Sequence, residues 1–196
     1  YARGIHVDDS GNIYVVDHNR HRVLKYTLAD GSYTQSIVAG GNDRGSSLNQ
    51  LYYPTGLYVD ASNAVYVVDE RNHRIVKWPE GSTQGVLVAG GNDSGNALNQ
   101  LYNPHGVSVD SSGNIYVADY SNNRIMKWAP DASDGIILFS VNYPTKVHVD
   151  SSGNVFVLDY NSSRVLKYTL SDGAFTQSSV AGTGGIGSEL NQLKYP

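Results

Sequence analysis

Cysteine is absent from the 196 residues, which excludes disulfide bonds, thiolate metal ligands and cysteine nucleophiles. Charged residues are scarce, at 16%, and the formal net charge is −4. The chain therefore lacks the clustered Lys and Arg with which proteins bind polyanions. No apolar run approaches the length needed to span a membrane, and no signal peptide is recognisable. We expect neither nucleic-acid binding nor membrane insertion.

One short sequence repeat occurs four times in the chain, most clearly between Pro104 and Trp128. Two aspartates, an arginine and a lysine recur in phase: Asp8, Asp60, Asp110 and Asp150; Asp17, Asp69, Asp119 and Asp159; Arg22, Arg74, Arg124 and Arg164; Lys25, Lys77, Lys127 and Lys167. Such a period indicates that each copy is one structural unit stacked beside the next. We divide the single domain 1–196 into the repeats 1–52, 53–102, 103–142 and 143–194, with 195–196 starting a further cycle.

Within the first copy, β-branched and aromatic residues separated by turn signals predict strands over 4–8, 13–17, 22–28 and 34–39. The second strand is apolar on both faces in every copy, which indicates a sheet buried on both sides. Four-stranded antiparallel sheets, repeated in tandem and buried on both faces, predict the blades of an all-β propeller. A β-solenoid is the alternative.

Three motifs carry a family resemblance: Pro-x-Gly-apolar-x-Val-Asp, Gly-Asn-Ile/Val-Tyr-Val-x-Asp, and Asn-x-Arg-Ile/Val-x-Lys-Trp/Tyr. Together they resemble the NHL repeat over essentially the whole chain. The spacer Val-Ala-Gly-Gly-Asn through Leu-Asn-Gln-Leu to Tyr-Pro is similar to that of secreted invertebrate NHL proteins. Two departures are Ala2-Arg3-Gly4, where other copies begin with Pro, and Lys146, where others have Gly. The resemblance implies a propeller, most often six-bladed. The four blades here are then either a segment of a longer array or a unit closed by itself or by other copies.

The repeated carboxylates and guanidinium groups are expected to be structural. Asp17, Asp69, Asp119 and Asp159 each precede an arginine by five residues, and such a pair can tie a loop to the next strand. The loop from Asp8 to Asn12 lacks the alternating carboxylates of a calcium site and is expected to be a hairpin turn.

Catalytic motifs are missing, because neither a Gly-x-Ser-x-Gly elbow nor a phosphate loop occurs. The resemblance extends to peptidyl-hydroxyglycine amidating lyases, in which three histidines, each following a Pro, hold zinc. Only Pro104-His105 matches that pattern, since Arg3, Thr55 and Thr145 occupy the equivalent positions. We therefore expect no metal, no cofactor and no enzyme activity. His6 and His148 share the middle of the innermost strand, where they face either the channel or a neighbouring blade.

The copies differ most in the loop before the repeated arginine, and a rigid scaffold that presents variable loops is typical of binding proteins. The 15 tyrosines, against three phenylalanines, suit half-exposed contact surfaces. We predict a non-enzymatic extracellular scaffold that binds a protein, a glycan or copies of itself. The candidate binding residues are His18, Arg20, His21, Glu70, Arg71, His73, Tyr120, Asn122 and Tyr160.

Two N-x-Ser/Thr sequons, at Asn92 and Asn161, are candidate glycosylation sites and favour secretion. The first residue is Tyr1 rather than Met, so we expect a processed or excised N-terminus. One alternative function is a structural module that assembles head to tail into a larger ring or fibre. A zinc-dependent, amidating-lyase-like enzyme is the other alternative.

Overall fold

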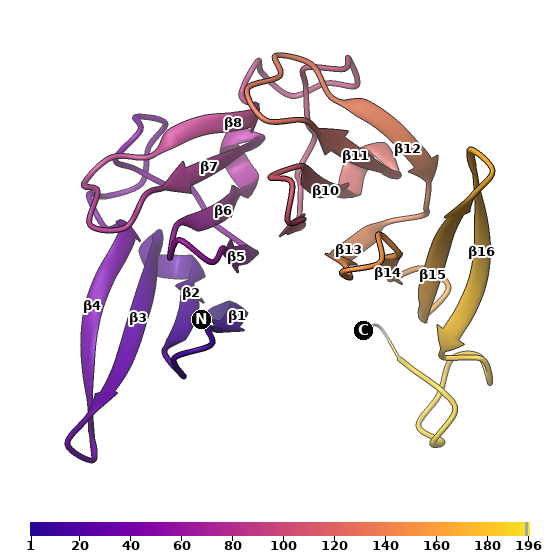
Figure 1. The fold of residues 1–196 in the computed structure, drawn as a ribbon, viewed down its shortest axis with the longest axis horizontal. Coiled ribbons are helices and arrows are strands. Elements are labelled where there is room, and N and C mark those ends of the chain that lie inside the picture. Colours follow the sequence, from indigo (N-terminus) through magenta and orange to yellow (C-terminus); the bar gives the residue numbers. More distant parts are fainter. Residues whose placement is uncertain (195) are drawn as a thin grey trace.

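A computed structural model of the chain describes residues 1–194 and 196, so the expected start of a further cycle lies partly outside the described residues, at Tyr195. Four antiparallel sheets of four strands each stand side by side in an open arc (Figure 1). We call them blades 1 to 4. Their strands are β1 (Ala2–Val7), β2 (Ile13–Asp17), β3 (Arg22–Ala29) and β4 (Ser32–Gly40); β5 (Leu57–Val59), β6 (Val65–Asp69), β7 (Arg74–Trp78) and β8 (Val86–Gly90); β9 (Gly106–Val109), β10 (Ile115–Asp119), β11 (Arg124–Trp128) and β12 (Ile136–Ser140); β13 (Pro144–Val149), β14 (Val155–Asp159), β15 (Arg164–Ser171) and β16 (Ala174–Ala181).

Each blade is a meander, with its strands paired in chain order. The all-β fold of propeller blades is therefore confirmed, although β1 and β4 begin two residues earlier than the sequence predicted. Short 3-10 turns connect the second and third strands in blades 1 to 3: His18–Arg20, Glu70–Asn72 and Tyr120–Asn122. No helix in the described part of the chain is long and apolar enough to cross a membrane.

The turn between the first two strands of each blade is built around an aspartate, as predicted. In blade 1 the Asp8 carboxylate accepts hydrogen bonds from the backbone N–H groups of Ser10 and Asn12, at 3.0 and 2.8 Å. Asp60, Asp110 and Asp150 accept the equivalent bonds in the other blades. These hydrogen bonds account for the carboxylates without a bound cation.

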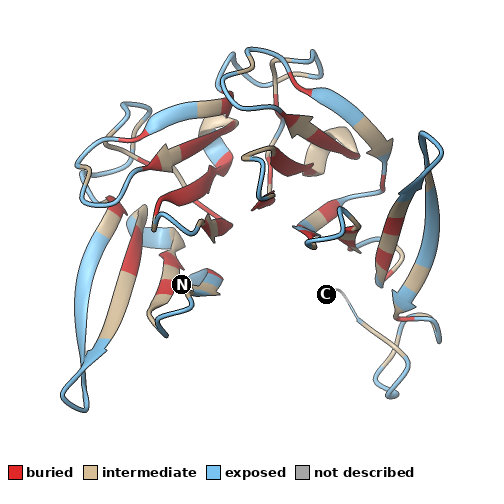
Figure 2. Cartoon of the chain, viewed as in Figure 1, coloured by how far each residue is buried: buried red, intermediate tan, exposed pale blue. Residues whose placement is uncertain are grey.

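The core consists of three apolar seams between neighbouring blades. Trp78 and Trp128 are almost fully buried in the first two seams. Strands β6 and β10 are buried along their whole length, whereas β2 and β14 alternate between buried and half-buried residues (Figure 2). The predicted burial on both faces thus holds only for blades 2 and 3, because blades 1 and 4 each have one face without a neighbour.

The two ends of the arc do not meet (Figure 1). At the first end, the side chains of Ile5 and Val7 are 70% and 56% exposed. At the other end, Leu193 is half-buried, while its equivalents Leu51 and Leu101 are completely buried against the following blade. The apolar surface at each end therefore corresponds to one half of an internal seam.

The spacers after blades 1 and 2, residues 38–54 and 88–104, bind the arginine of the next blade. The Arg74 guanidinium donates to the backbone carbonyls of Ser46, Ser47 and Gln50 at 2.6–3.2 Å, and its Nε donates to Asp69 at 2.7 Å. Arg124 makes the same set of bonds to the second spacer and to Asp119. The repeated arginine therefore ties each spacer to the blade that follows it.

At blade 4 this arrangement is missing, because no spacer precedes the blade. Arg164 is exposed, and the carboxylate of Asp159 accepts the backbone N–H of Ser162 at 2.9 Å instead. Arg22 of blade 1 contacts Asp17 at 3.1 Å. Three of the four predicted Asp–Arg pairs are thus in contact in the structure, and two of these are buried.

Candidate functional site

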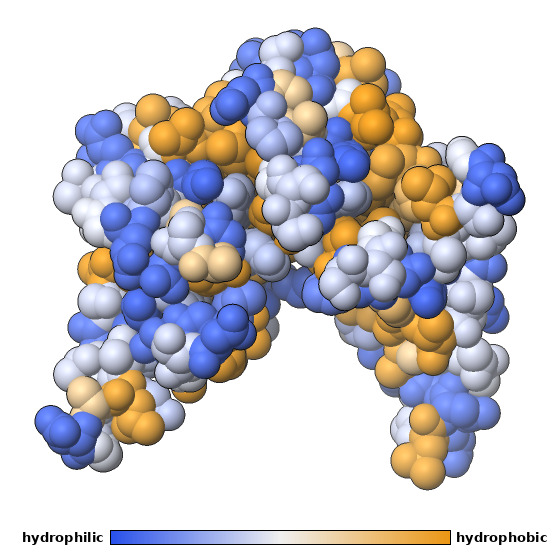
Figure 3. Space-filling model, in the orientation of Figure 1, coloured by the Kyte–Doolittle hydropathy of each residue, from blue (hydrophilic) through white to orange (hydrophobic). Residues whose placement is uncertain are grey.

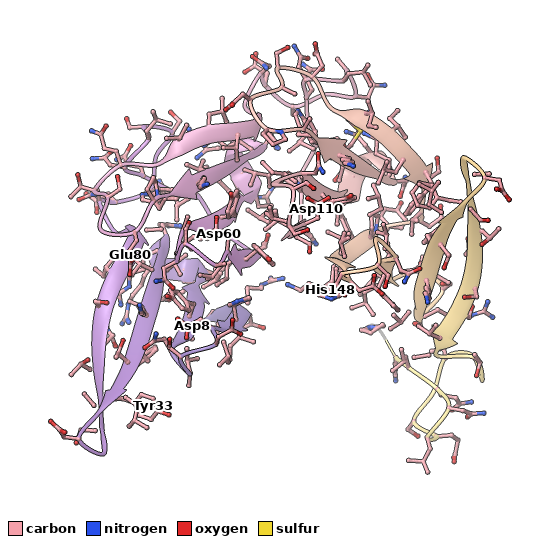
Figure 4. The ribbon with its side chains drawn as sticks, in the orientation of Figure 1. Asp8, Tyr33, Asp60, Glu80, Asp110 and His148 are labelled. Atoms are coloured by element: carbon pink, nitrogen blue, oxygen red, sulfur yellow. The ribbon has the colours of Figure 1, made fainter. Side chains whose placement is uncertain are left out.

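The inner strands of the four blades line an open cavity of about 250 Å³ on the inner side of the arc, which we call the channel. Its polar lining residues are Arg3, His6, Tyr58, Ser108, Lys146 and His148. The two histidines of the inner strand therefore face the channel, one of the two orientations that the sequence allowed. In Figure 4, His148 lies on the inner side of the arc, whereas Tyr33 and Glu80 lie on its outside.

At one end of this channel, residues from two blades meet. Glu70 begins the 3-10 turn after β6, and His105 precedes β9 in the next blade. The Glu70 Oε2 and His105 Nε2 atoms are 4.0 Å apart, and Oε1 lies 3.4 Å from the Nε of Arg71. The His105 ring stacks on Tyr120, with the ring centroids 4.1 Å apart and the planes 12° from parallel. This stacking holds the imidazole where it faces the carboxyl group.

Burial shifts the pKa of both partners toward the neutral form. It raises the pKa of the Glu70 carboxyl, an effect that the Arg71 guanidinium opposes. It also lowers the pKa of His105 to about 4, with further lowering by the positive charges of Arg3 and Lys146. His105 is therefore neutral at pH 7, and the pair is a carboxyl group facing an imidazole rather than a salt bridge.

The predicted binding residues fall into separate groups. Glu70, Arg71 and Tyr120 gather at the channel end, and the Nδ1 of His18 lies 2.9 Å from the Pro54 carbonyl oxygen at the neighbouring seam. Arg20 is exposed and lies 3.8 Å from Asp17, and Tyr160 is also exposed. The glycosylation candidates Asn92 and Asn161 are exposed as well, and Asn92 donates to the Asn99 carbonyl at 3.1 Å.

His21, His73 and Asn122 instead connect structural elements. The Nδ1 atoms of His21 and His73 accept the backbone N–H groups of Tyr53 and Asn103 in the next blade, at 3.1 and 3.2 Å. Asn122 donates to the Gly95 carbonyl of the preceding spacer at 2.8 Å. These contacts fasten neighbouring blades together, and burial lowers the pKa of both histidines.

The donor set does not fit the zinc site of the amidating lyases. Within residues 1–194 and 196, no group of three His, Asp or Glu side chains is close enough to hold a metal ion. Zinc in a catalytic site needs three protein ligands and an open position. We therefore derive no step through zinc.

The neutral state of His105 predicts an acid-sensitive contribution to stability. A histidine whose pKa is lowered by folding stabilises the folded state fully above its ordinary pKa of 6.5, and this contribution is lost as the pH falls toward about 4. We expect a loss of up to about 3 kcal/mol over that interval. Urea denaturation of the wild type and of His105→Gln at several pH values measures it. An equal pH slope for both proteins would contradict the assignment.

The NHL repeat family model matches residues 1–26, 51–78, 101–128 and 141–168, which together make up more than half of the chain. The chain belongs to the NHL repeat family. The resemblance inferred from the three motifs is thereby confirmed. A search of curated protein sequences found no match.

Several solved structures share the fold of this NHL chain. The virginiamycin B lyase of Staphylococcus aureus, solved with quinupristin, has a TM-score of 0.63 and 17% identity, and the match covers 90% of the NHL chain and 54% of the lyase. A gluconolactonase from Xanthomonas campestris has a TM-score of 0.71 and 16% identity, with 92% and 62% covered. The NHL chain thus spans about half to three fifths of these proteins, and identities this low show the fold alone.

The prediction of a non-enzymatic binding scaffold is corrected by this comparison, because these structural neighbours are enzymes. The expectation rested on missing linear motifs. However, Glu70 and His105 come from different blades and meet only in the folded NHL chain. One signal was present in the sequence. Glu70 is the only acidic residue at this position of the repeat, where the other copies have His18, Tyr120 and Tyr160.

Proposed function

We propose that this NHL chain carries the acid–base site of an enzyme that opens a lactone ring, with Glu70 as the general base. The observation that carries the proposal is the Glu70–His105 contact at the end of the channel, with 4.0 Å between Oε2 and Nε2. A carboxylate whose pKa is raised by burial is a stronger base than an exposed one. Paired with a neutral imidazole, it can accept a proton near pH 7.

The surrounding charges suit an acyl substrate. Arg3 and Lys146 lie near enough to His105 to lower its pKa. Cations placed beside the reacting carbonyl would stabilise the negative charge that develops on its oxygen. The similarity to gluconolactonase structures supports a lactone as the substrate class.

The proposed reaction is hydrolysis. Glu70 accepts a proton from a water molecule, and the resulting hydroxide adds to the lactone carbonyl carbon. The oxyanion then collapses and breaks the ring C–O bond. The alkoxide that leaves takes the proton back from Glu70, which restores the carboxylate.

The test is turnover of a panel of lactones by the purified chain, with product masses recorded by mass spectrometry. We expect ring-opened products that carry the added mass of one water molecule, formed faster than in buffer. Glu80→Gln serves as the control, because Glu80 lies on the outside of the arc (Figure 4). The absence of any acceleration would refute the proposal, and a ring-opened product of unchanged mass would indicate elimination instead of hydrolysis.

A further inference from the structure

Two cationic side chains line the channel. Arg3, from β1, and Lys146, from β13, both line the cavity although they belong to opposite ends of the arc. Desolvation lowers the pKa of Lys146, and the nearby positive charge of Arg3 lowers it further. Neither forms a salt bridge with any residue that the structure describes. Both side chains are exposed to solvent, and the repulsion between two like charges that share a cavity is relieved when an anion binds between them.

The other lining groups add hydrogen-bond donors and no acid. His6, Tyr58, Ser108 and His148 complete the polar wall, and no carboxylate is present among the described lining residues. Figure 3 shows hydrophilic side chains meeting at the centre of the arc, between its two arms. The cavity measures about 250 Å³. Its chemistry therefore suits a small molecule with negative charge.

The lysine also departs from the repeat. At the position equivalent to Lys146, the other blades have Gly4, Gly56 and Gly106. The backbone of the next blade approaches these glycines closely. A Cβ atom at Gly56, for example, would lie 2.6 Å from the His105 carbonyl oxygen. Blade 4 instead places a long cationic side chain at this position, and that side chain lines the channel.

We propose that the channel binds a small oxyanion, a carboxylate or a phosphate group, between the Arg3 guanidinium and the Lys146 ammonium group. Guanidinium groups form bidentate, charge-assisted hydrogen bonds with either anion. The bound anion would supply a counter-charge directly between these two cations. This site uses cations that also serve the proposed lactone opening, but the binding itself needs no catalysis.

Isothermal titration of the purified chain with acetate and with inorganic phosphate tests the proposal, and acetamide is the neutral comparison. We expect saturable binding of at least one anion, weakened by added salt, and no binding of acetamide. Binding of acetate alone would assign the site to carboxylates, and binding of both anions to oxyanions in general. Failure of both anions to bind, or equal binding of acetamide, would overturn the proposal.

Variants that restore the residues of other blades keep this test interpretable. Arg3→Thr and Lys146→Gly introduce the residues that blade 2 has at the equivalent positions, Thr55 and Gly56. Together they are expected to weaken anion binding at least tenfold. Lys167→Gln, outside the channel, should leave binding unchanged. Glu70→Gln should bind the anion at least as tightly as wild type, which separates this proposal from the catalytic one. Unchanged binding in the Arg3→Thr/Lys146→Gly double variant would refute the assignment.

Discussion

Replacing Arg74 by alanine is expected to lower the free energy of unfolding by about 3–5 kcal/mol, because it leaves a buried carboxylate without its partner. Asp69 is completely buried, and the Arg74 Nε donates to it at 2.7 Å. The substitution also leaves the carbonyls of the preceding spacer without their donor. Urea denaturation of the purified variant measures the loss.

The chain supplies a matched control in Arg164, which has the same place in its blade but is exposed and has no spacer to hold. Arg164→Ala should change stability by less than about 0.5 kcal/mol. Burial raises the pKa of Asp69, and removing Arg74 should raise it further, so the Arg74→Ala deficit should shrink as the pH is lowered and the carboxyl takes up a proton. Equal losses in Arg74→Ala and Arg164→Ala would show that the contacts between Arg74 and the spacer contribute nothing.

Glu70→Gln is expected to lower kcat/KM for lactone opening by about 10²–10⁴-fold, the usual contribution of a general base. Glutamine keeps the shape of the side chain but cannot accept the proton. In the wild type the rate should rise with pH through the raised pKa of Glu70, and this acid limb should disappear in the variant. Steady-state rates across pH provide both readouts.

Two comparisons decide how the Glu70→Gln result is interpreted. Glu80→Gln removes an exposed carboxylate on the outside of the arc and should leave the rate unchanged. Urea denaturation of Glu70→Gln should show a folded protein, because the carboxyl is only partly charge-paired in the wild type. Wild-type turnover in Glu70→Gln would exclude this residue as the base.

Much of the blade could be predicted from sequence because its rules are local. The alternation of apolar residues and the Asp-centred turn after Asp8 depend on neighbours a few residues apart, and the bounds of β2 were correct. Burial on both faces was overestimated for β2 and β14, because it depends on a neighbouring blade that the repeat alone does not guarantee.

Contacts between blades could not be read in the same way. The Asp–Arg spacing predicted four similar pairs, but the spacer carbonyls that bind Arg74 lie more than twenty residues away in the sequence. Likewise, no local pattern joins Glu70 to His105, since Glu70 belongs to the 3-10 turn of blade 2 and His105 precedes β9 in blade 3. The candidate site forms only when the blades stack. The sequence alone showed which position of the repeat each of its residues occupies.

The open arc has a consequence for the order in which the 196-residue chain loosens. Blades in such an array contact only adjacent blades, so local opening is expected to start at blades 1 and 4, which each share a seam with one other blade of the chain. The seam between blades 2 and 3, which buries Trp128 and Met126, is flanked by a further blade on each side and should open last. Glu70 and His105 face each other across this seam. The acid–base pair therefore lies at the seam that is expected to open last, and local unfolding of blades 1 and 4 would leave its geometry in place.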